Sequence, residues 1–295
     1  MQIAEDAVVV GYDGSDRSKA ALHWGASLAD LENLPLVVLH ASGVIVHAQD
    51  KGVGNFDAGR ANAQAQKIAE HGVELATKDF PKVEATTATS LGSASLALQE
   101  ASIRARCVVL GNRGRGRISG TLMGSTAFNT SEHARCPVVI VPTAKADLPG
   151  PDSPIMVGVD GSEASLRAVD RAANMAGYTG APVTIVVAWS KATKDALGNP
   201  PSGFASVDEA SEHRKAGAEH FVDKARARLL ERTPDATVEL LVETGRPDEV
   251  LAKASADAGL LVVGARGRGD LASLLLGSTS RAVLHRASCP VTIVR

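Results

Sequence analysis

The sequence repeats itself once, and this internal repeat constrains the fold more than any other feature. The segment VVVGYDGS at 8–15 returns as IMVGVDGS at 155–162. Three further blocks recur in the same order: VVLGNRGRG (108–116) as LVVGARGRG (261–269), LMGST (122–126) as LLGST (275–279), and ARCPVVIV (134–141) as ASCPVTIV (287–294). Matching blocks are 147 residues apart in the first case and 153 apart in the other three. Four blocks in a fixed order indicate a duplicated domain.

A stretch between the two copies has the composition of a linker. Residues 143–154 read TAKADLPGPDSP, and Pro, Gly and small polar residues are typical of connecting segments. A chain of 295 residues with 44% hydrophobic residues is long enough to bury two cores. We therefore predict a first domain at 1–143, a linker at 144–153 and a second domain at 154–295.

Short runs of Val and Ile alternate with longer Ala-rich segments in both copies. Strands are predicted at 7–11, 35–41, 83–89, 106–111 and 137–142, and again at 154–159, 182–189, 236–243, 260–264 and 290–294. Amphipathic helices are predicted at 17–31, 61–78, 93–105 and 125–133, and at 165–176, 210–232, 247–258 and 278–285. Wholly apolar strands are typical of buried parallel sheets, so the fold class is α/β with two tandem Rossmann-like domains. Each domain is expected to be an open five-stranded parallel sheet flanked by helices, with a ligand crevice at the carboxyl ends of the strands.

The composition disfavours several classes of partner. With a formal net charge of −2 and 3% aromatic residues, the chain lacks the basic balance and the stacking side chains that favour nucleic-acid binding. Glu5 and Asp6 stand where a secretory signal has basic residues, and no apolar run approaches the roughly 20 residues of a membrane span. Cys107, Cys136 and Cys289 form no C-x-x-C pair, which fits a reducing compartment. We expect a cytoplasmic protein with no nucleic-acid partner and no membrane partner.

A glycine-rich pattern follows the fourth strand of each copy: Gly-x-x-Gly, nine residues, then Gly-Ser-Thr. The positions are Gly111, Gly114, Gly124, Ser125 and Thr126 in the first copy, and Gly264, Gly267, Gly277, Ser278 and Thr279 in the second. The first glycine allows a nucleotide close to the backbone, and the second allows the loop to turn. The last glycine and the serine open a helix, where free N–H groups and the helix dipole suit phosphate oxygens. The alternative is that these residues only form turns and helix caps.

An aspartate directly follows the first strand of each copy. Asp13 and Asp160 lie in Gly-Tyr-Asp-Gly-Ser and Gly-Val-Asp-Gly-Ser. A carboxylate at this edge can accept hydrogen bonds from ribose hydroxyls, but Asp-Gly-Ser is also a common turn and helix entry. Since the first strand usually lies beside the fourth in this topology, Asp13 is expected next to Gly111, and Asp160 next to Gly264. That adjacency favours a role in ligand binding.

These motifs resemble those of the universal stress protein family, in particular its ATP-binding branch, which is marked by G-x-x-G-x9-G-S/T. The resemblance covers nearly the whole chain, twice, and implies up to two ATP molecules per chain. It assigns Asp13 and Asp160 to the nucleoside, the glycine-rich positions to ribose and phosphates, and Ala41 and Trp189 to the adenine-lining position. Ala41 is smaller than the branched aliphatic residue usual there, and Trp189 either stacks on the base or fills the core.

The resemblance also implies how the sheets associate. In this family the last strands, here 137–142 and 290–294, pair between domains or between chains. A bare sheet edge invites such pairing in any case. We expect the chain to form a homodimer through edge strands.

Arginines in the glycine-rich loops have two interpretations. They are Arg113, Arg115 and Arg117 in the first copy, and Arg266 and Arg268 in the second. Guanidinium groups match phosphate geometry and would clamp the β- and γ-phosphates of a bound nucleotide. The alternative is a solvated basic loop.

The sequence lacks the motifs of fast phosphoryl transfer. It has no G-x-x-x-x-G-K-[ST] loop, no kinase signature and no evident nucleophile with a paired base. Mg²⁺ would be carried by the phosphates, since it often uses few protein ligands. The leading interpretation is a nucleotide-responsive regulator in stress response or growth arrest, acting on an unknown regulatory protein partner. The alternatives are a slow ATPase or nucleotidyl-transfer enzyme, and a scaffold with vestigial nucleotide pockets.

Overall fold

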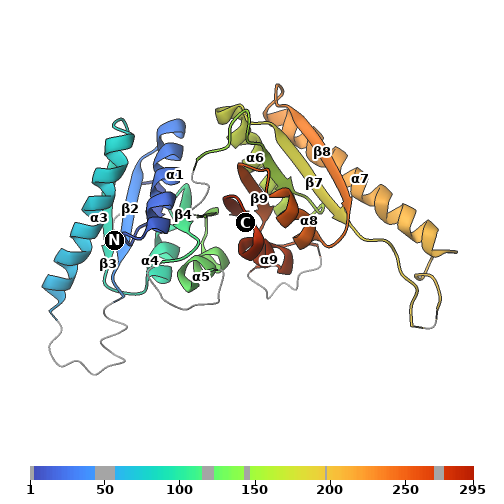
Figure 1. Ribbon diagram of the computed structural model, residues 1–295, viewed down its shortest axis with the longest axis horizontal. Helices are drawn as coiled ribbons and strands as arrows, with labels where there is room; N and C mark the ends of the chain where they lie inside the picture. Colours follow the sequence, from blue (N-terminus) through green and yellow to red (C-terminus); the bar gives the residue numbers. More distant parts are fainter. Residues whose placement is uncertain (1–2, 44–56, 115–122, 143–146, 197, 269–275) are drawn as a thin grey trace. The chain divides into compact units, whose positions relative to one another are not determined.

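The chain folds into two compact units (Figure 1). The computed structural model describes residues 3–43, 57–114, 123–142, 147–196, 198–268 and 276–295. One unit is made of Met1–Leu148, Cys289–Ile293 and Arg295, and the other of Pro149–Ser288 and Val294. In each unit, buried strands are covered by helices.

The first unit contains the first copy of the repeat. Its strands are β1 (Val8–Gly11), β2 (Leu36–Ala41), β3 (Ala85–Ser90), β4 (Cys107–Gly111) and β5 (Val138–Val141), in the spatial order β3-β2-β1-β4-β5. All four neighbouring pairs are parallel. The helices are α1 (Asp16–Glu32), α3 (Ala58–Asp79), α4 (Ala94–Ala101) and α5 (Ser125–His133).

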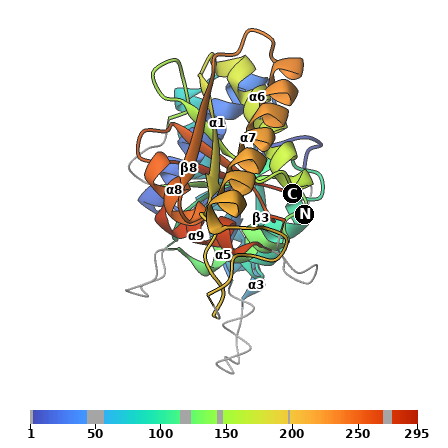
Figure 2. The same ribbon diagram turned by 90° about the vertical axis from the view of Figure 1, so that its right-hand side faces the viewer.

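The second unit repeats this arrangement. Its strands are β6 (Ile155–Gly158), β7 (Val183–Trp189), β8 (Val238–Thr244) and β9 (Leu260–Gly264), in the order β9-β6-β7-β8 and again parallel. The helices are α6 (Glu163–Thr179), α7 (Val207–Arg232), α8 (Pro247–Ala254) and α9 (Ser278–Arg286). Figure 2 faces this unit and shows α7 and α8 on opposite sides of β8. The α/β fold class is thus confirmed.

The last strand, β10 (Val291–Val294), runs antiparallel to β5. Val291 lies opposite Ile140, and Ile293 lies opposite Val138. The strand belongs to the second copy in sequence, yet most of it is counted with the first compact unit. The expectation that the segments 137–142 and 290–294 pair is therefore met inside a single chain.

Local sequence explains where the main helices begin. The hydroxyls of Ser15 and Ser162 accept hydrogen bonds from the backbone N–H groups of Ser18 and Ser165, which caps α1 and α6. Such caps stabilise a helix by about 1 kcal/mol each. In both copies the Asp-Gly-Ser turn therefore ends the first strand and starts the first helix. This turn places the aspartate at the carboxyl edge of the sheet.

Candidate functional site

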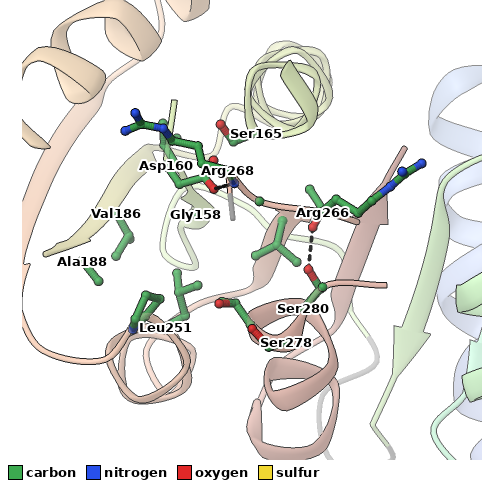
Figure 3. A pocket seen from close by; sticks show the side chains of 17 residues that line it. Gly158, Asp160, Ser165, Val186, Ala188, Leu251, Arg266, Arg268, Ser278 and Ser280 are labelled. Atoms are coloured by element: carbon green, nitrogen blue, oxygen red, sulfur yellow. Dashed lines mark hydrogen bonds between the residues drawn. The ribbon is translucent and has the colours of Figure 1, made fainter. Parts of the chain in front are cut away.

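A cavity of about 340 Å³ opens at the carboxyl edge of the second unit's sheet. Seven predicted binding residues line it: Asp160, Gly264, Arg266, Gly267, Gly277, Ser278 and Thr279. The apolar part of its wall comes from β7 and α8, namely Val186, Ala188 and Leu251 (Figure 3). The cavity thus joins an apolar region to a region rich in backbone amides and hydroxyls.

Asp160 holds two loops together at one side of the cavity. Its Oδ1 accepts a hydrogen bond from the backbone N–H of Ser162 at 3.0 Å, as expected for an Asp-Gly-Ser turn. Its Oδ2 accepts one from the backbone N–H of Arg268, also at 3.0 Å. Sequence reasoning missed this second bond, which links the turn after β6 to the loop after β9. Each carboxylate oxygen can accept a further hydrogen bond, so both roles proposed for Asp160 are compatible.

The glycine that ends the fourth strand is required by helix packing. A Cβ on Gly264 would lie 2.8 Å from the backbone carbon of Ala164 at the start of α6. In the first unit a Cβ on Gly111 would lie 2.7 Å from the backbone oxygen of Arg17 in α1. The missing Cβ points toward the helix, so helix packing requires glycine here in addition to the predicted approach of a nucleotide, which stays a prediction. The small residue brings the strand end and the capped helix close together.

The helix that follows the glycine-rich loop starts without a side-chain cap. Gly124 and Gly277 are the N-cap residues of α5 and α9, and neither helix has a side-chain hydrogen bond at this end. The N–H of Gly277 donates a hydrogen bond to the carbonyl of Ala265 at 2.7 Å. The N–H groups of the first turn, from Ser278 onward, therefore face the cavity as hydrogen-bond donors at the positive end of the dipole. This arrangement suits an anionic oxygen.

The two arginines of the second loop are among the residues that line the cavity. Figure 3 shows the side chains of Arg266 and Arg268 pointing away from the cavity, to opposite sides. The guanidinium carbon of Arg268 lies 4.7 Å from the centre of the Phe221 ring on α7. In this conformation neither side chain forms the predicted phosphate clamp. Arg115 and Arg117 of the first loop lie outside the described residues.

The first unit brings together the corresponding residues. The Oδ1 of Asp13 accepts a hydrogen bond from the backbone N–H of Ser15 at 3.0 Å. A Cβ on Gly114 would lie 2.8 Å from the Oδ2 of Asp13, so the glycine lets the loop after β4 pass over the carboxylate. Gly124 lies beside the start of the same loop, because its N–H donates a hydrogen bond to the carbonyl of Asn112 at 2.8 Å. Asp13 and the glycine-rich loop are therefore neighbours, as their counterparts are in the second unit.

Comparison with known proteins identifies the family of the chain. The model of the family described as "Universal stress protein family" matches residues 6–142 and again residues 153–295. The chain belongs to the universal stress protein family.

Relatives of this family match over the full repeat. A universal stress protein of Mycobacterium tuberculosis is 36% identical over 300 residues, which cover 99% of this chain and 97% of the relative. One from Mycolicibacterium smegmatis is 32% identical over 302 residues, with 99% and 97% covered. The crystal structure of a universal stress protein from Archaeoglobus fulgidus superposes with a TM-score of 0.63 at 20% identity, covering 98% of this chain and 96% of the other. The last comparison supports the fold alone.

The family resemblance assigned Ala41 and Trp189 to equivalent places, and the sheet register corrects this pairing. Gly11 lies beside Leu39, and Gly158, its counterpart, lies beside Val186. Counting two residues onward makes Ala188 the counterpart of Ala41, and Trp189 is one residue further along. Neighbouring residues of a strand point to opposite faces. Ala188 accordingly lines the cavity, and Trp189 is not among its lining residues.

A network around Tyr12 distinguishes the first unit of this family member from the second. The ring Nδ1 of His40 lies 2.7 Å from the carbonyl oxygen of Tyr12, and the Tyr12 hydroxyl lies 3.0 Å from the Nδ1 of His71 on α3. Val159 occupies the place of Tyr12 in the second copy. His40 and Tyr12 are buried, so these bonds satisfy polar groups inside the first unit.

The described residues show little else that points to catalysis. Among them, no group of three His, Cys, Asp or Glu side chains is placed to hold a metal ion. Of the carboxylates in the described ranges, only Asp160 lines the cavity, and both of its oxygens accept backbone N–H groups. Within the same described ranges, no helix is long and apolar enough to cross a bilayer.

Proposed function

We propose that each unit binds an adenine nucleotide, that ATP is the ligand of at least one unit, and that occupancy regulates a protein partner during stress or growth arrest. One observation carries the proposal: the second unit surrounds a single cavity with a carboxylate, a glycine-rich loop and an uncapped helix N-terminus. Family membership supports the role in stress. The repeat supports a second site of the same kind around Asp13.

The lining of the cavity divides into parts that match the parts of a nucleotide. The apolar surface of Val186, Ala188 and Leu251 suits a base, which gains free energy from burial against it. Asp160 has acceptor capacity left for ribose hydroxyls. Ser278 and Thr279 lie at the positive end of α9 and suit a phosphate. Mg²⁺, where bound, would be held mainly by phosphate oxygens.

Regulation follows from the way the loops are linked. Asp160 bonds the loop after β9 through the backbone N–H of Arg268. A ribose that shares this carboxylate would bias the position of the loop, and with it the surface offered to a partner. Chemistry is expected to be slow, because Asp160, the one carboxylate among the described residues of the lining, already accepts two backbone N–H groups.

The experiment uses a charge placed where a phosphate is expected. Ser125→Glu and Ser278→Glu put a carboxylate in the first turns of α5 and α9, where a negative charge stabilises the helix. We expect the double variant to fold and to bind ATP at least ~30-fold more weakly than the natural protein, by titration calorimetry. The matched control, Ser125→Gln with Ser278→Gln, has the same length without the charge and should lose much less affinity. Equal affinity in the Glu and Gln variants would contradict the proposal.

A further inference from the structure

The segment 265–268, which follows β9, forms one wall of the second unit's cavity and is bonded to Asp160. Arg266 and Arg268 of this segment belong to the lining, and the backbone N–H of Arg268 donates to the Oδ2 of Asp160 at 3.0 Å. This hydrogen bond is exposed, so water competes for both of its groups and its net contribution is modest. The shape of the wall therefore depends on what else holds Arg268.

A second contact of Arg268 joins the segment to α7. The guanidinium carbon of Arg268 lies 4.7 Å from the centre of the Phe221 ring. The face of an aromatic ring is negative, so it attracts the guanidinium group above it. Phe221 is half-buried, which makes its ring a more fixed partner than an exposed side chain. Arg268 is thus held at its backbone by Asp160 and at its side chain by Phe221.

Phe221 also packs against the turn that carries Asp160. Gly161 has a φ of +80°, and a Cβ there would lie 2.6 Å from the Phe221 ring. The contacts therefore form a closed set: Asp160 bonds Arg268, Arg268 contacts Phe221, and Phe221 lies against the residue that follows Asp160. A change in the position of the segment acts on α7, and a change in α7 acts on the segment.

The aromatic partner of Arg268 lies behind the cavity wall and is a property of the second copy. Phe221 is not among the described residues that line the cavity, so its influence on a ligand passes through Arg268 and Gly161. When α3 and α7 are aligned by their C-terminal ends, Ile68 corresponds to Phe221. An aliphatic side chain has no negative ring face to attract a guanidinium group.

We propose that Phe221 is a positioning residue of the second nucleotide site, which holds the segment 265–268 in place through Arg268 and makes α7 the element that responds to nucleotide. This inference rests on the nucleotide-binding function proposed above and deepens it. If the segment is released, only the molecules with the wall in place bind, and the apparent affinity falls by that fraction. By linkage, a bound nucleotide that needs the wall also restrains α7.

The response of α7 matters because this helix is part of the surface of the second unit. Lys215 and Glu219, for example, each expose more than half of their side chains. A restraint on α7 therefore changes how rigidly these side chains are presented to a protein partner. The regulation proposed above thus has a specific element that carries it.

The first experiment measures ATP affinity by titration calorimetry in full-length Ser125→Glu protein, where the added charge weakens the first site. Phe221→Leu removes the ring face but keeps an apolar side chain, and we expect it to raise the Kd about 3- to 10-fold. Phe221→Tyr keeps the ring and should stay within about 2-fold of the Ser125→Glu protein. Val222→Ala removes buried volume at the next position of α7, and as a control for general loosening it should change the Kd less than ~2-fold.

A double-mutant cycle shows whether the effect passes through Arg268. In protein that already carries Arg268→Gln the contact is absent, so adding Phe221→Leu should change the Kd by less than ~2-fold. If the two substitutions instead multiply their effects, Phe221 does not act through the guanidinium group.

Hydrogen exchange followed by mass spectrometry tests the response of α7. Saturating ATP should slow exchange at least ~3-fold in peptides around Phe221 in Ser125→Glu protein, and should leave these peptides unchanged when Phe221→Leu is also present. Without nucleotide, Phe221→Leu should speed exchange of the Arg268 amide, because its bond to Asp160 opens more often.

The outcomes separate this inference from the proposed function. If neither the natural protein nor Ser125→Glu protein binds an adenine nucleotide, the proposed function fails and the inference fails with it. If Ser125→Glu protein binds ATP, the function stands, and the inference is overturned by any of three results: equal or tighter binding in Phe221→Leu, an equal loss in Val222→Ala, or multiplied effects in the cycle. A loss in Phe221→Leu that is absent in Phe221→Tyr and masked by Arg268→Gln would support the inference.

Discussion

An ion cluster between α6 and α7 should make the second unit sensitive to acid. Asp170 of α6 accepts hydrogen bonds from two arginines of α7: both carboxylate oxygens bind Arg228, at 2.7 and 2.6 Å, and Oδ1 also binds Arg232 at 2.6 Å. Burial alone would raise the pKa of Asp170, but the hydrogen bonds and charges of Arg228, followed by those of Arg232, hold it below its ordinary value. We predict that Asp170→Asn destabilises the second unit at neutral pH.

The exposure of the three side chains sets the magnitude. The Asp170 side chain is 17% exposed, but those of Arg228 and Arg232 are 36% and 45% exposed. A hydrogen bond to a charged group contributes about 1.5–3 kcal/mol, and solvent screening of half-exposed arginines reduces this. We expect a loss of about 1.5 kcal/mol in the free energy of unfolding, or about 0.7 M in the urea midpoint at a slope of about 2 kcal/mol per M.

The direction of the pH dependence follows from the lowered pKa. Stability from a depressed carboxyl is present above the unfolded-state pKa of about 3.9 and is lost as the pH falls through the folded-state value. The natural protein and Asp170→Asn should therefore differ at pH 7, and the difference should shrink as the pH falls below about 3.9 toward the lowered folded-state pKa. Trp189 is the tryptophan of the second copy, so a Trp24→Phe background lets its fluorescence report on this unit.

The control is an exposed ion pair on α7, the helix that carries Arg228 and Arg232. Lys215 and Glu219 lie 3.7 Å apart with more than half of each side chain exposed, so Glu219→Gln should cost no more than about 0.5 kcal/mol. An Asp170→Asn effect as small as that of Glu219→Gln, or one that does not shrink as the pH is lowered below about 3.9, would refute the reasoning.

Three further predictions follow from the geometry of the site and the sheets. Gly264→Ala should destabilise the second unit by about 1–3 kcal/mol in thermal unfolding, because its Cβ meets Ala164; an unchanged midpoint would contradict that contact. Ala188→Leu should weaken nucleotide binding at the second site at least ~10-fold by filling the cavity, whereas Trp189→Phe should change it less than ~3-fold. Light scattering at micromolar concentration should give the mass of a homodimer, formed through the terminal strands β3 and β8, and a monomeric mass would exclude it.

Sequence reasoning identified the fold because its signals are local. Runs of Val and Ile mark the strands, and the serine after each Asp-Gly turn caps the following helix. The topology then brings the ends of the first and fourth strands to one edge, so Asp160 and the glycine-rich loop meet without further information. Each of these inferences needs only the order of elements along the chain.

The remaining features depend on directions that sequence order does not contain. Ala188 and Trp189 are adjacent in the chain but face opposite sides of β7, and only the pairing of Gly158 with Val186 decides which of them lines the cavity. The direction of the missing Cβ of Gly264, toward α6, is set by packing. The sequence therefore suggested the role of this glycine at the ligand but not its close contact with α6. The contact of Arg268 with Phe221 joins a loop to the middle of a distant helix, and no spacing rule predicts it.

The two copies have diverged in sets of residues that depend on one another. When α3 and α7 are aligned by their C-terminal ends, Leu75 and Asp79 of the first copy correspond to Arg228 and Arg232 of the second. By the 147-residue offset of the first repeat block, His23 corresponds to Asp170.

If neither arginine were present, the carboxylate of Asp170 would be a partly buried, unpaired charge. The aspartate of the second copy therefore depends on the arginines of α7. The arginines follow Phe221 by two and three helical turns on α7, which is therefore tied to α6 at one end and to Arg268 further along. The residues that hold α7 on α6 thus also position the aromatic ring that the Arg268 guanidinium group contacts.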